Sequence, residues 1–408
     1  MLAAGVEAII CAQPRNIYYL TNHMPQLVKM GMRDLAYAIL PLDPAEAPIL
    51  VIGQFAYYLS ATERALPGLV DVRLFTSPAE DASVFAQKSM LEQIETPAGS
   101  SFLPTIHDFQ PVHPVELSRR TITNSIETEM AASSEAALVK AVRGLALAGK
   151  RVAVDDEALA VILEKSEAPI VARDGERLIR HIRVQKSPAE IVLARYAARA
   201  NAEAGLRAAK SIRDGATYQE MRLEYARACA ERMLTPSFMV IDGVIPDTAP
   251  GKIEEGRAFL IDCVSEHQGY HGDYGRTVCV GEPTREIARA TDALSKVWDT
   301  LLPQLAPGMR YSQISSLAAE AFGRLNSDAA LICNPHSVGL NHTDEPGREG
   351  VAHWMKDDLE LVEGMVLSVD LPMVDLGLGG SGHLEDLVLI GKDGAELLND
   401  TGDRVIIV

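Results

Sequence analysis

Two aspartates stand at the inner ends of two apolar runs in the middle of the chain. Residues 258–261 (Ala-Phe-Leu-Ile) lead directly into Asp262, and residues 278–280 (Val-Cys-Val) follow shortly after Asp273. The pattern predicts two strands joined by a tight bend, with one aspartate near each inner strand end. The glycines that would permit the bend are Gly269, Gly272 and Gly275. Two carboxylates that face one interior repel each other unless a positive charge lies between them, and a metal ion is the simplest such charge.

Four later residues carry compatible chemistry, each at or near the edge of an expected strand. His336 and His342 lie close together beside a short apolar run, Asp370 ends another run, and Glu385 comes just before a third. Side chains at strand edges can reach a common interior, so these four and the two aspartates could form one metal site. Taken alone, an aspartate of the pair is more simply explained as a turn cap, because aspartate is common in turns. The ordered set favours the metal site.

The first half of the chain contains the elements of an α/β layer domain. The strands are expected at residues 7–12, 35–40, 47–52, 151–155 and 168–172. Helices are expected at residues 55–65 and 157–165, and residues 14–20 are expected to form a turn that leads into a short helix or strand. No concentrated catalytic cluster falls in this half, so its expected role is structural, with a wall or lid for the other half.

A capping box marks the start of the second half. Ser187 stands at the N-cap, followed by Pro188 at the first helical position and Glu190 at the third. The predicted helix continues through an apolar stripe to Leu206, and a second helix is expected at residues 218–233. Further on, the chain predicts a strand, the hairpin, two helices and more strands, at residues 238–241, 258–280, 285–305, 311–325, 336–350, 365–372 and 383–390. This order indicates an α+β domain with a largely antiparallel sheet.

Composition excludes some classes of binding partner and indicates a cellular compartment. A net charge of -18 over 408 residues argues against non-specific binding of nucleic acid or anionic membrane. No stretch approaches ~18 consecutive apolar residues, and the start of the chain has no basic region followed by an apolar core, so neither a membrane span nor a secretory signal is expected. The cysteines are scattered and odd in number, which indicates reduced thiols in a cytoplasmic protein. They are Cys11, Cys229, Cys263, Cys279 and Cys333.

The order Asp, Asp, His, acidic residue, Glu resembles the pita-bread metallopeptidase family, which includes methionine aminopeptidase, aminopeptidase P and proline dipeptidase. The step from Asp262 to Asp273, followed by Arg-Thr, is similar to the strand motif of that family. The segments 336–340, 364–370 and 385–386 are similar to its later motifs. Residues 14–20 (Pro-Arg-Asn-Ile-Tyr-Tyr-Leu) resemble the N-terminal domain of the proline-directed branch and of creatinase. The resemblance implies a creatinase-like domain over residues 1–180 and a pita-bread catalytic domain over residues 181–408.

The resemblance also implies roles for the site residues. Asp262 would bind one metal ion, Asp273 and Glu385 would bridge two, and His336 and Asp370 would complete the other. Asp370 would also assist proton transfer, and His342 would contact the substrate. Two divalent ions are implied, and oxygen ligands with one imidazole suit manganese, cobalt, iron or zinc. The implied activity is metal-dependent hydrolysis of a C–N bond in a dipeptide or other small molecule, by a homodimer.

The sequence departs from the family pattern in several places. Asp370 stands where the family usually has glutamate, and residues 242–251 lack the histidine that the peptidases have there. His342 follows His336 by six residues, where seven is usual, and residues 347–349 (Gly-Arg-Glu) are more similar to creatinase. The chain begins almost directly at its first expected strand, which favours a natural start further upstream.

These departures leave two other functions open. One is a non-peptidase member of the family that acts on a small metabolite, as creatinase, ectoine hydrolase and sulfoniopropionate lyase do. The other is a catalytically inactive relative that serves for binding. Among the remaining polar residues, His267 and His271 are expected in the hairpin bend and exposed to solvent, Arg276 is expected to pair with an acid, and Arg348 and Glu349 are expected to form a surface ion pair. Asn16 and Tyr19 are expected to be turn and core residues.

Overall fold

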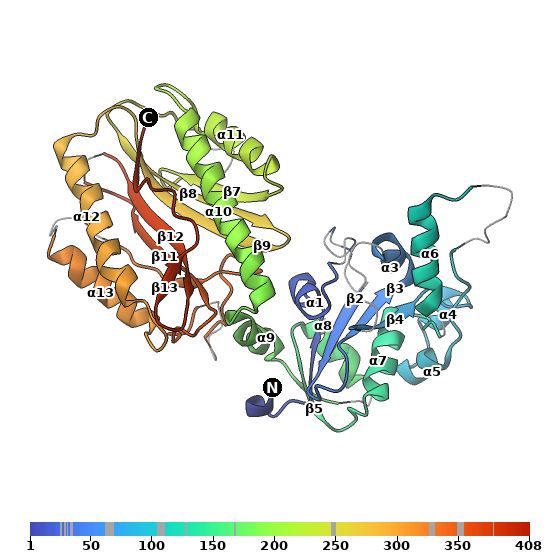
Figure 1. The fold of residues 1–408 in the computed structure, drawn as a ribbon. Coiled ribbons are helices and arrows are strands. Elements are labelled where there is room, and N and C mark those ends of the chain that lie inside the picture. The colour runs from blue at the N-terminus through green and yellow to red at the C-terminus, as the bar shows by residue number, and fades with distance from the viewer. Residues whose placement is uncertain are drawn as a thin grey trace. The chain divides into compact units, whose positions relative to one another are not determined.

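The computed structural model describes the chain except for residues 25–26, 28–29, 31, 33–35, 62–68, 104–110, 127–128, 167–168, 246–249, 326–330, 349–354 and 378. It divides into two compact units, Met1–Ile179 and Arg180–Val408, each with its own sheet (Figure 1). In the sequence, the boundary between the two units falls within helix α9 (Gly175–Val184). No described helix has both the length and the apolar composition needed to span a bilayer.

The N-terminal unit is built on a six-stranded mixed sheet of order β4-β3-β2-β1-β5-β6. The central strands are buried along almost their whole length, as expected for the continuous apolar runs of the sequence. The strands are β1 (Ala8–Cys11), β2 (Ala36–Pro41), β3 (Ile49–Gly53), β4 (Asp71–Phe75), β5 (Arg151–Val154) and β6 (Ile170–Ala172). The α/β fold expected of this half is therefore present.

Helices α7 and α8 supply much of the apolar core of the N-terminal unit, together with strands β1, β3 and β5. Both begin at a side-chain cap, Ser133 for α7 and Asp156 for α8. The helices of this unit are α1 (Pro14–Thr21), α3 (Gln54–Ser60), α4 (Ala82–Phe85), α5 (Met90–Glu95), α6 (Pro114–Ile126), α7 (Ser134–Gly144) and α8 (Glu157–Glu164). At the start of α1, Asn16 is buried and donates to Asp155 Oδ2 at 2.8 Å.

The C-terminal unit contains an eight-stranded sheet whose main path runs β10-β11-β12-β9-β8-β7. Neighbouring strands on this path are antiparallel. Off the path, β13 pairs with β12 in antiparallel and β14 pairs with β9 in parallel. The strands are β7 (Thr235–Ile241), β8 (Ala258–His267), β9 (Tyr270–Cys279), β10 (His336–Ser337), β11 (Val366–Met373), β12 (Gly382–Ile390), β13 (Ala395–Leu397) and β14 (Val405–Ile407).

Two helix pairs pack on this sheet, and Figure 1 shows the sheet between them. The first pair, α10 (Pro188–Ser211) and α11 (Tyr218–Ala230), shares an apolar core with β7, β8 and β9. The second pair, α12 (Arg285–Leu301) and α13 (Tyr311–Gly323), shares another core with β11 and β12. Helix α10 begins with the capping box predicted at Ser187 and Glu190. The helix pairs hold the central strands in register.

The central hairpin has longer strands and a shorter bend than the sequence predicts. Strands β8 and β9 have ten residues each, and only Gln268 and Gly269 form the bend, both with positive φ (49° and 87°) as in the common two-residue hairpin turn. Asp262 and Asp273 therefore lie well inside the strands, not at their ends. The expectation that His271 faces solvent was wrong, because it lies in β9 and is buried.

Gly272 has a packing role in place of the expected turn role. A Cβ atom at this position would lie 2.3 Å from the carbonyl oxygen of Ala197 in α10. The absence of a side chain therefore lets helix α10 approach strand β9 closely.

Candidate metal centre

Four residues of the C-terminal sheet stand in one row across four strands. Asp262 in β8 is directly opposite Gly275 in β9, Gly275 is opposite Glu385 in β12, and Glu385 is opposite Asp370 in β11. Opposed residues in a sheet project to the same face. The strand register thus brings Asp262 together with two carboxylates more than a hundred residues further along the chain, Asp370 and Glu385, with the side-chain-free Gly275 among them.

The remaining ligand candidates lie two residues along from this row or on the next strand. Asp273 is two residues before Gly275 and shares its face, because side chains alternate along a strand. His336 in β10 places Nε2 3.5 Å from Asp273 Oδ2 and 4.0 Å from Glu385 Oε1. Glu385 Oε1 also accepts a hydrogen bond of 2.5 Å from Ser368 Oγ. Asp273, His336 and Glu385 are all buried.

His342 lies at the solvent side of the cluster, in the loop after β10. Its Nε2 is 3.0 Å from Asp273 Oδ2, and its side chain is 33% exposed while that of Asp273 is fully buried. The imidazole packs at a tilt on the His336 ring and edge-on to Phe238. This is the position of a group that could contact a bound substrate.

Two acidic residues fasten the loop that carries His342. Asp344 forms a fully buried ion pair with Arg183, and Lys186 Nζ lies 3.9 Å from its second oxygen. Glu345 Oε2 accepts hydrogen bonds from the Ser337 backbone N–H and, at 2.7 Å, from the Tyr311 hydroxyl. The end of the loop that follows His342 is therefore held by buried polar contacts, one of which joins it to Ser337 at the start of the loop.

His383 is a member of the cluster that the sequence analysis missed. Its Nε2 lies 2.6 Å from Asp370 Oδ1 and 3.8 Å from Glu385 Oε2, and the ring is buried. The signal was available in the sequence, because a residue two positions from Glu385 on one strand must share its face. The family motif points to Glu385 alone, although His383 begins the strand predicted at residues 383–390.

The buried carboxyl groups of the cluster differ in pKa, which is raised for Asp262 and Glu385 but lowered for Asp273, where the effect of burial is outweighed by the charge of His342. Burial, followed by the charge of Asp273, raises the pKa of Asp262 to about 7 and raises the pKa of Glu385 well above its ordinary value. Burial lowers the pKa of His336 to about 4. Burial alone would lower the pKa of His342 as well, but the neighbouring Asp273 outweighs it and raises the pKa to about 9. The cluster thus concentrates negative charge that a bound cation would offset.

The donor atoms fit a divalent metal. Four buried carboxylate oxygens of the cluster, Asp262 Oδ1, both oxygens of Asp273 and Glu385 Oε2, have no hydrogen-bond partner among the described residues. Unpaired buried acceptors of this kind are costly unless something else satisfies them. Donor atoms within 4.8 Å of one another form three overlapping groups: Asp262, Asp273 and Glu385; Asp370, His383 and Glu385; and Asp273, His336 and His342. All six predicted residues, with His383, therefore lie in one cluster of carboxylates and imidazoles, the ligand types of divalent transition metals.

Other polar residues named from the sequence have structural contacts. Arg276 is buried and pairs with Asp386 at 2.6 Å, as expected, and it also donates to the Glu385 carbonyl oxygen. His267 packs against the Tyr196 ring. Glu349, and residues 246–249 of the segment that lacks the family histidine, lie outside the described residues.

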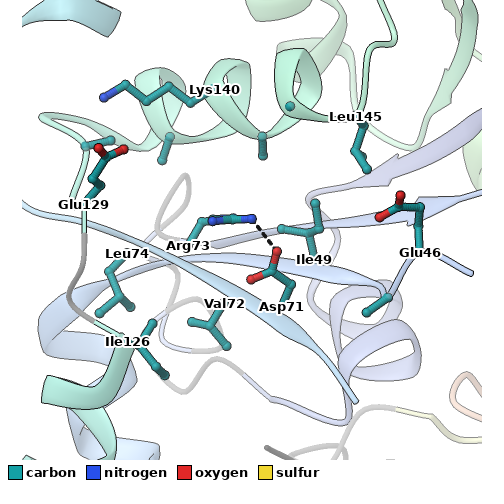
Figure 2. Close-up of a pocket in the computed structure, with 15 residues that line it drawn as sticks. Glu46, Ile49, Asp71, Val72, Arg73, Leu74, Ile126, Glu129, Lys140 and Leu145 are labelled. Carbon is teal, nitrogen blue, oxygen red and sulfur yellow. Dashed lines mark hydrogen bonds and ion pairs between the residues drawn. The ribbon is translucent and has the colours of Figure 1, made fainter. Parts of the chain in front are cut away.

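A separate hollow of about 710 Å³ lies in the N-terminal unit between strand β4 and helix α7 (Figure 2). Its charged lining residues have both signs, and Arg73 is paired with Asp71 inside it. None of the described residues that line it is a histidine or a cysteine. Nothing in its lining matches the chemistry of the cluster in the C-terminal unit.

Residues 193–392 match the sequence profile of metallopeptidase family M24, a region that contains every residue of the cluster. Among curated proteins, the chain is 25% identical over 249 residues to a probable dipeptidase PepE of Mycobacterium tuberculosis, covering 59% of this chain and 64% of that protein. It is 24% identical over 244 residues to an Xaa-Pro dipeptidase of Lactobacillus delbrueckii subsp. lactis, covering 57% and 65%. The chain thus matches just under two thirds of the length of these relatives.

The fold of the whole chain is similar to solved structures of the same group. A prolidase from Pyrococcus furiosus superposes with a TM-score of 0.66 at 18% identity, covering 98% of both chains. An Xaa-Pro dipeptidase from Bacillus anthracis gives a TM-score of 0.69 at 15% identity, covering 100% of this chain and 96% of the other. The resemblance and the fold predicted from the sequence are confirmed. Residues 193–392 belong to metallopeptidase family M24, and the C-terminal unit has the pita-bread fold of that family.

Proposed function

We propose that the protein is a metal-dependent peptidase that hydrolyses the C–N bond of a dipeptide, in the manner of an Xaa-Pro dipeptidase. The observation that carries the proposal is the buried cluster of carboxylates and imidazoles on the central strands of an M24 domain. The names of the relatives, dipeptidase and Xaa-Pro dipeptidase, support a dipeptide as the substrate class.

Asp262, Asp273, His336, Asp370 and Glu385 would hold the metal. Divalent ions bound there would polarise the scissile carbonyl and lower the pKa of water, which supplies a nucleophile at neutral pH. Glu385 and Asp273 each present carboxylate oxygens to more than one group of donors, which supports their predicted role as bridges between two ions. Ser368 fixes the Glu385 carboxylate through its hydrogen bond, so the bridge would need little reorganisation on binding.

Two residues would serve the substrate and its protons. His342 is partly exposed at the solvent side of the cluster, so its imidazole could donate a hydrogen bond to a bound dipeptide. Asp370 is 21% exposed, whereas Asp273 and Glu385 are buried, and it could accept a proton from water and deliver it to the leaving nitrogen. The fastened loop beneath His342 would hold the imidazole in place.

The metal, the compartment and the assembly are further parts of the proposal. We assign two divalent ions, drawn from manganese, cobalt, iron and zinc, because the donors are carboxylates and imidazoles. The five cysteines are all free thiols, which supports a cytoplasmic location. A homodimer is proposed by analogy with the proline-directed relatives, and sedimentation of the purified protein tests it.

The test is a substrate screen on protein reconstituted with each of the four metals. Xaa-Pro dipeptides, other dipeptides and small amides such as creatine are compared at equal concentration. Metal-dependent hydrolysis of dipeptides is the expected result. Turnover confined to the non-peptide amides, or turnover of nothing by fully metal-loaded protein, would contradict the proposal.

A further inference from the structure

We infer that His383 is a metal ligand, so that the centre has an imidazole on each side of Glu385, where the sequence predicts only one. The inference rests on the proposed metal centre and adds a ligand to it. His383 occupies a place in the donor cluster that no motif in the sequence analysis assigned.

The first argument is the arrangement around Glu385. Its two carboxylate oxygens face different histidines, with Oε1 4.0 Å from His336 Nε2 and Oε2 3.8 Å from His383 Nε2. Each histidine also has a carboxylate of its own, Asp273 at 3.5 Å from His336 and Asp370 at 2.6 Å from His383. Each side of Glu385 therefore offers an imidazole, an aspartate and one oxygen of the shared glutamate. The His336 side has His342 as a further imidazole beside Asp273.

The second argument is that the distances suit shared coordination. Two ligands bound to one ion at about 2.1 Å hold their donor atoms about 3 Å apart. The separations of 2.6 and 3.8 Å from His383 Nε2 lie on either side of that value. Glu385 Oε2 has no hydrogen-bond partner among the described residues, so a cation between it and His383 would satisfy an otherwise unpaired buried acceptor.

The third argument is that the fold makes room for this ring. Gly275 lies beside it, and a Cβ atom there would be 2.4 Å from His383 Cε1 and 2.5 Å from His383 Nδ1. Any other residue at position 275 would push the imidazole away from the carboxylates. The missing side chain of Gly275, in the middle of a fully buried strand, thus leaves the volume that the His383 ring occupies.

The short side chain of Asp370 explains why a further ligand from β12 would be needed at this place. Aspartate reaches less far than the glutamate usual at this position in the family, and His383 comes from the neighbouring strand to the same place. A second imidazole also changes the metal preference, because nitrogen ligands favour zinc and iron where carboxylates favour manganese. The centre should therefore discriminate against manganese more strongly than a site with one histidine.

The test compares metal binding by the wild-type protein, His383→Gln and His383→Ala, with His267→Gln as the matched control. Glutamine keeps most of the volume and can still hydrogen bond to Asp370, but it is a poor metal ligand. His267 lies at the end of β8 in the same sheet, outside the cluster, and among the described residues its side chain contacts Met233, Gln268 and Tyr196. The readouts are zinc and manganese equivalents per chain, their dissociation constants by calorimetry, and the visible absorption of cobalt-loaded protein. Circular dichroism checks the fold.

Wild type and His267→Gln should bind two zinc ions, whereas both His383 variants should bind the second at least about 100-fold more weakly, with a changed cobalt spectrum. The preference for zinc over manganese should fall in the same variants. His383→Gln with wild-type affinities and spectrum would overturn the inference, because it would show that His383 only positions Asp370. A wild-type protein that binds no metal would instead refute the proposed metal centre itself.

Discussion

At the scale of single residues, the centre depends on carboxylates that are held close together against their mutual repulsion. Burial and the neighbouring Asp273 raise the pKa values of Asp262 and Glu385, so the unliganded cluster keeps protons that a metal would displace. Ser368 orients Glu385 through a hydrogen bond, and imidazoles lie against Asp273 and Asp370. The residues are therefore arranged for a cation, at a cost in the stability of the metal-free protein.

Asp273 should be indispensable, since it lies in two of the three donor groups. Asp273→Asn keeps the shape of the side chain but removes its charge. Because outer contacts alone change metal affinity by about 10–100-fold, loss of this ligand should lower affinity and kcat/KM by more than about 100-fold. Calorimetric metal titration with dipeptidase assays measures both. Full metal content in the variant would contradict the bridging role.

Asp370→Glu restores the residue usual in the family but should impair this enzyme. The aspartate already reaches His383 Nε2 at 2.6 Å, so the extra methylene must displace one of the two side chains. A displacement of about 1 Å can cost about 100-fold in rate, and we expect kcat/KM to fall by about 10–100-fold. Steady-state kinetics on the preferred dipeptide measure the effect. Raised activity would show that the aspartate had weakened an ordinary site.

At the scale of elements, strand register assembles the centre. A shift of one residue in any of β8, β9, β11 or β12 would turn its ligand to the other face of the sheet. Two glycines in β9 serve this register differently. Gly275 leaves room for the ring of His383, whereas Gly272 leaves room for the backbone of helix α10.

Gly275→Ala and Gly272→Ala should therefore fail in different ways. Gly275→Ala should lower metal affinity at least about 10-fold, because a Cβ meets a ligand ring and Glu385 Cβ at 2.8 Å. Gly272→Ala should lower the free energy of unfolding by about 1–3 kcal/mol through overpacking against α10. Urea unfolding and metal titration on both variants separate the effects, with Gly323→Ala as control because nothing lies within 4 Å of its Cβ position. Equal behaviour of the two variants would contradict these assignments.

The His342 loop is the second element that positions the site. Asp344 and Arg183 are each 1% exposed, so removal of one charge leaves the other buried without its partner. Asp344→Asn should lower the free energy of unfolding by about 3–5 kcal/mol. The exposed pair of Asp299 with Arg404 is the control, and Asp299→Asn should cost at most about 1 kcal/mol. Similar effects of the two substitutions in urea unfolding would show that the buried pair does not anchor the loop.

At the scale of the whole molecule, the sequence was most informative where a pattern is local. The capping box at Ser187, the helix after it and most of the apolar strands are set by near neighbours, and the structure has them as predicted. Within the strand and loop segment expected at residues 336–350, only His336–Ser337 is a strand among the described residues. The hairpin was placed correctly, but its bend was predicted too long because Gly272 and Gly275 were assigned to it, although both serve packing inside β9. Close approach between distant segments leaves no local signature.

The residues of the cluster could be predicted only in part, because some of their contacts join distant segments of the chain. Ordered motifs pointed to six residues, and the structure brings all six together. The two-residue step to Glu385 shows that His383 shares its face, but the contact of His383 with Asp370 comes from the register of β12 against β11, which is a long-range property. The buried pair of Arg183 and Asp344 joins residues 161 positions apart and was equally invisible.

The two units should also respond differently to metal. All donors lie in the C-terminal unit, so added zinc should slow amide exchange in β8, β9, β11 and β12 and leave β1, β2 and β3 unchanged. At a free concentration of 100 times the dissociation constant, the added protection corresponds to about 2.7 kcal/mol. Hydrogen exchange with mass spectrometry resolves the segments. Protection confined to the N-terminal unit would place the metal elsewhere.

The central claim is that this cluster is a metal centre, and the most direct measurement is the metal content per chain. The protein is purified without added metal or chelator and analysed by plasma mass spectrometry, before and after reconstitution. The account predicts about two equivalents of a divalent transition metal, with the second lost in Asp273→Asn. Protein that holds no metal even after reconstitution would contradict the account, and the peptidase assignment would be withdrawn.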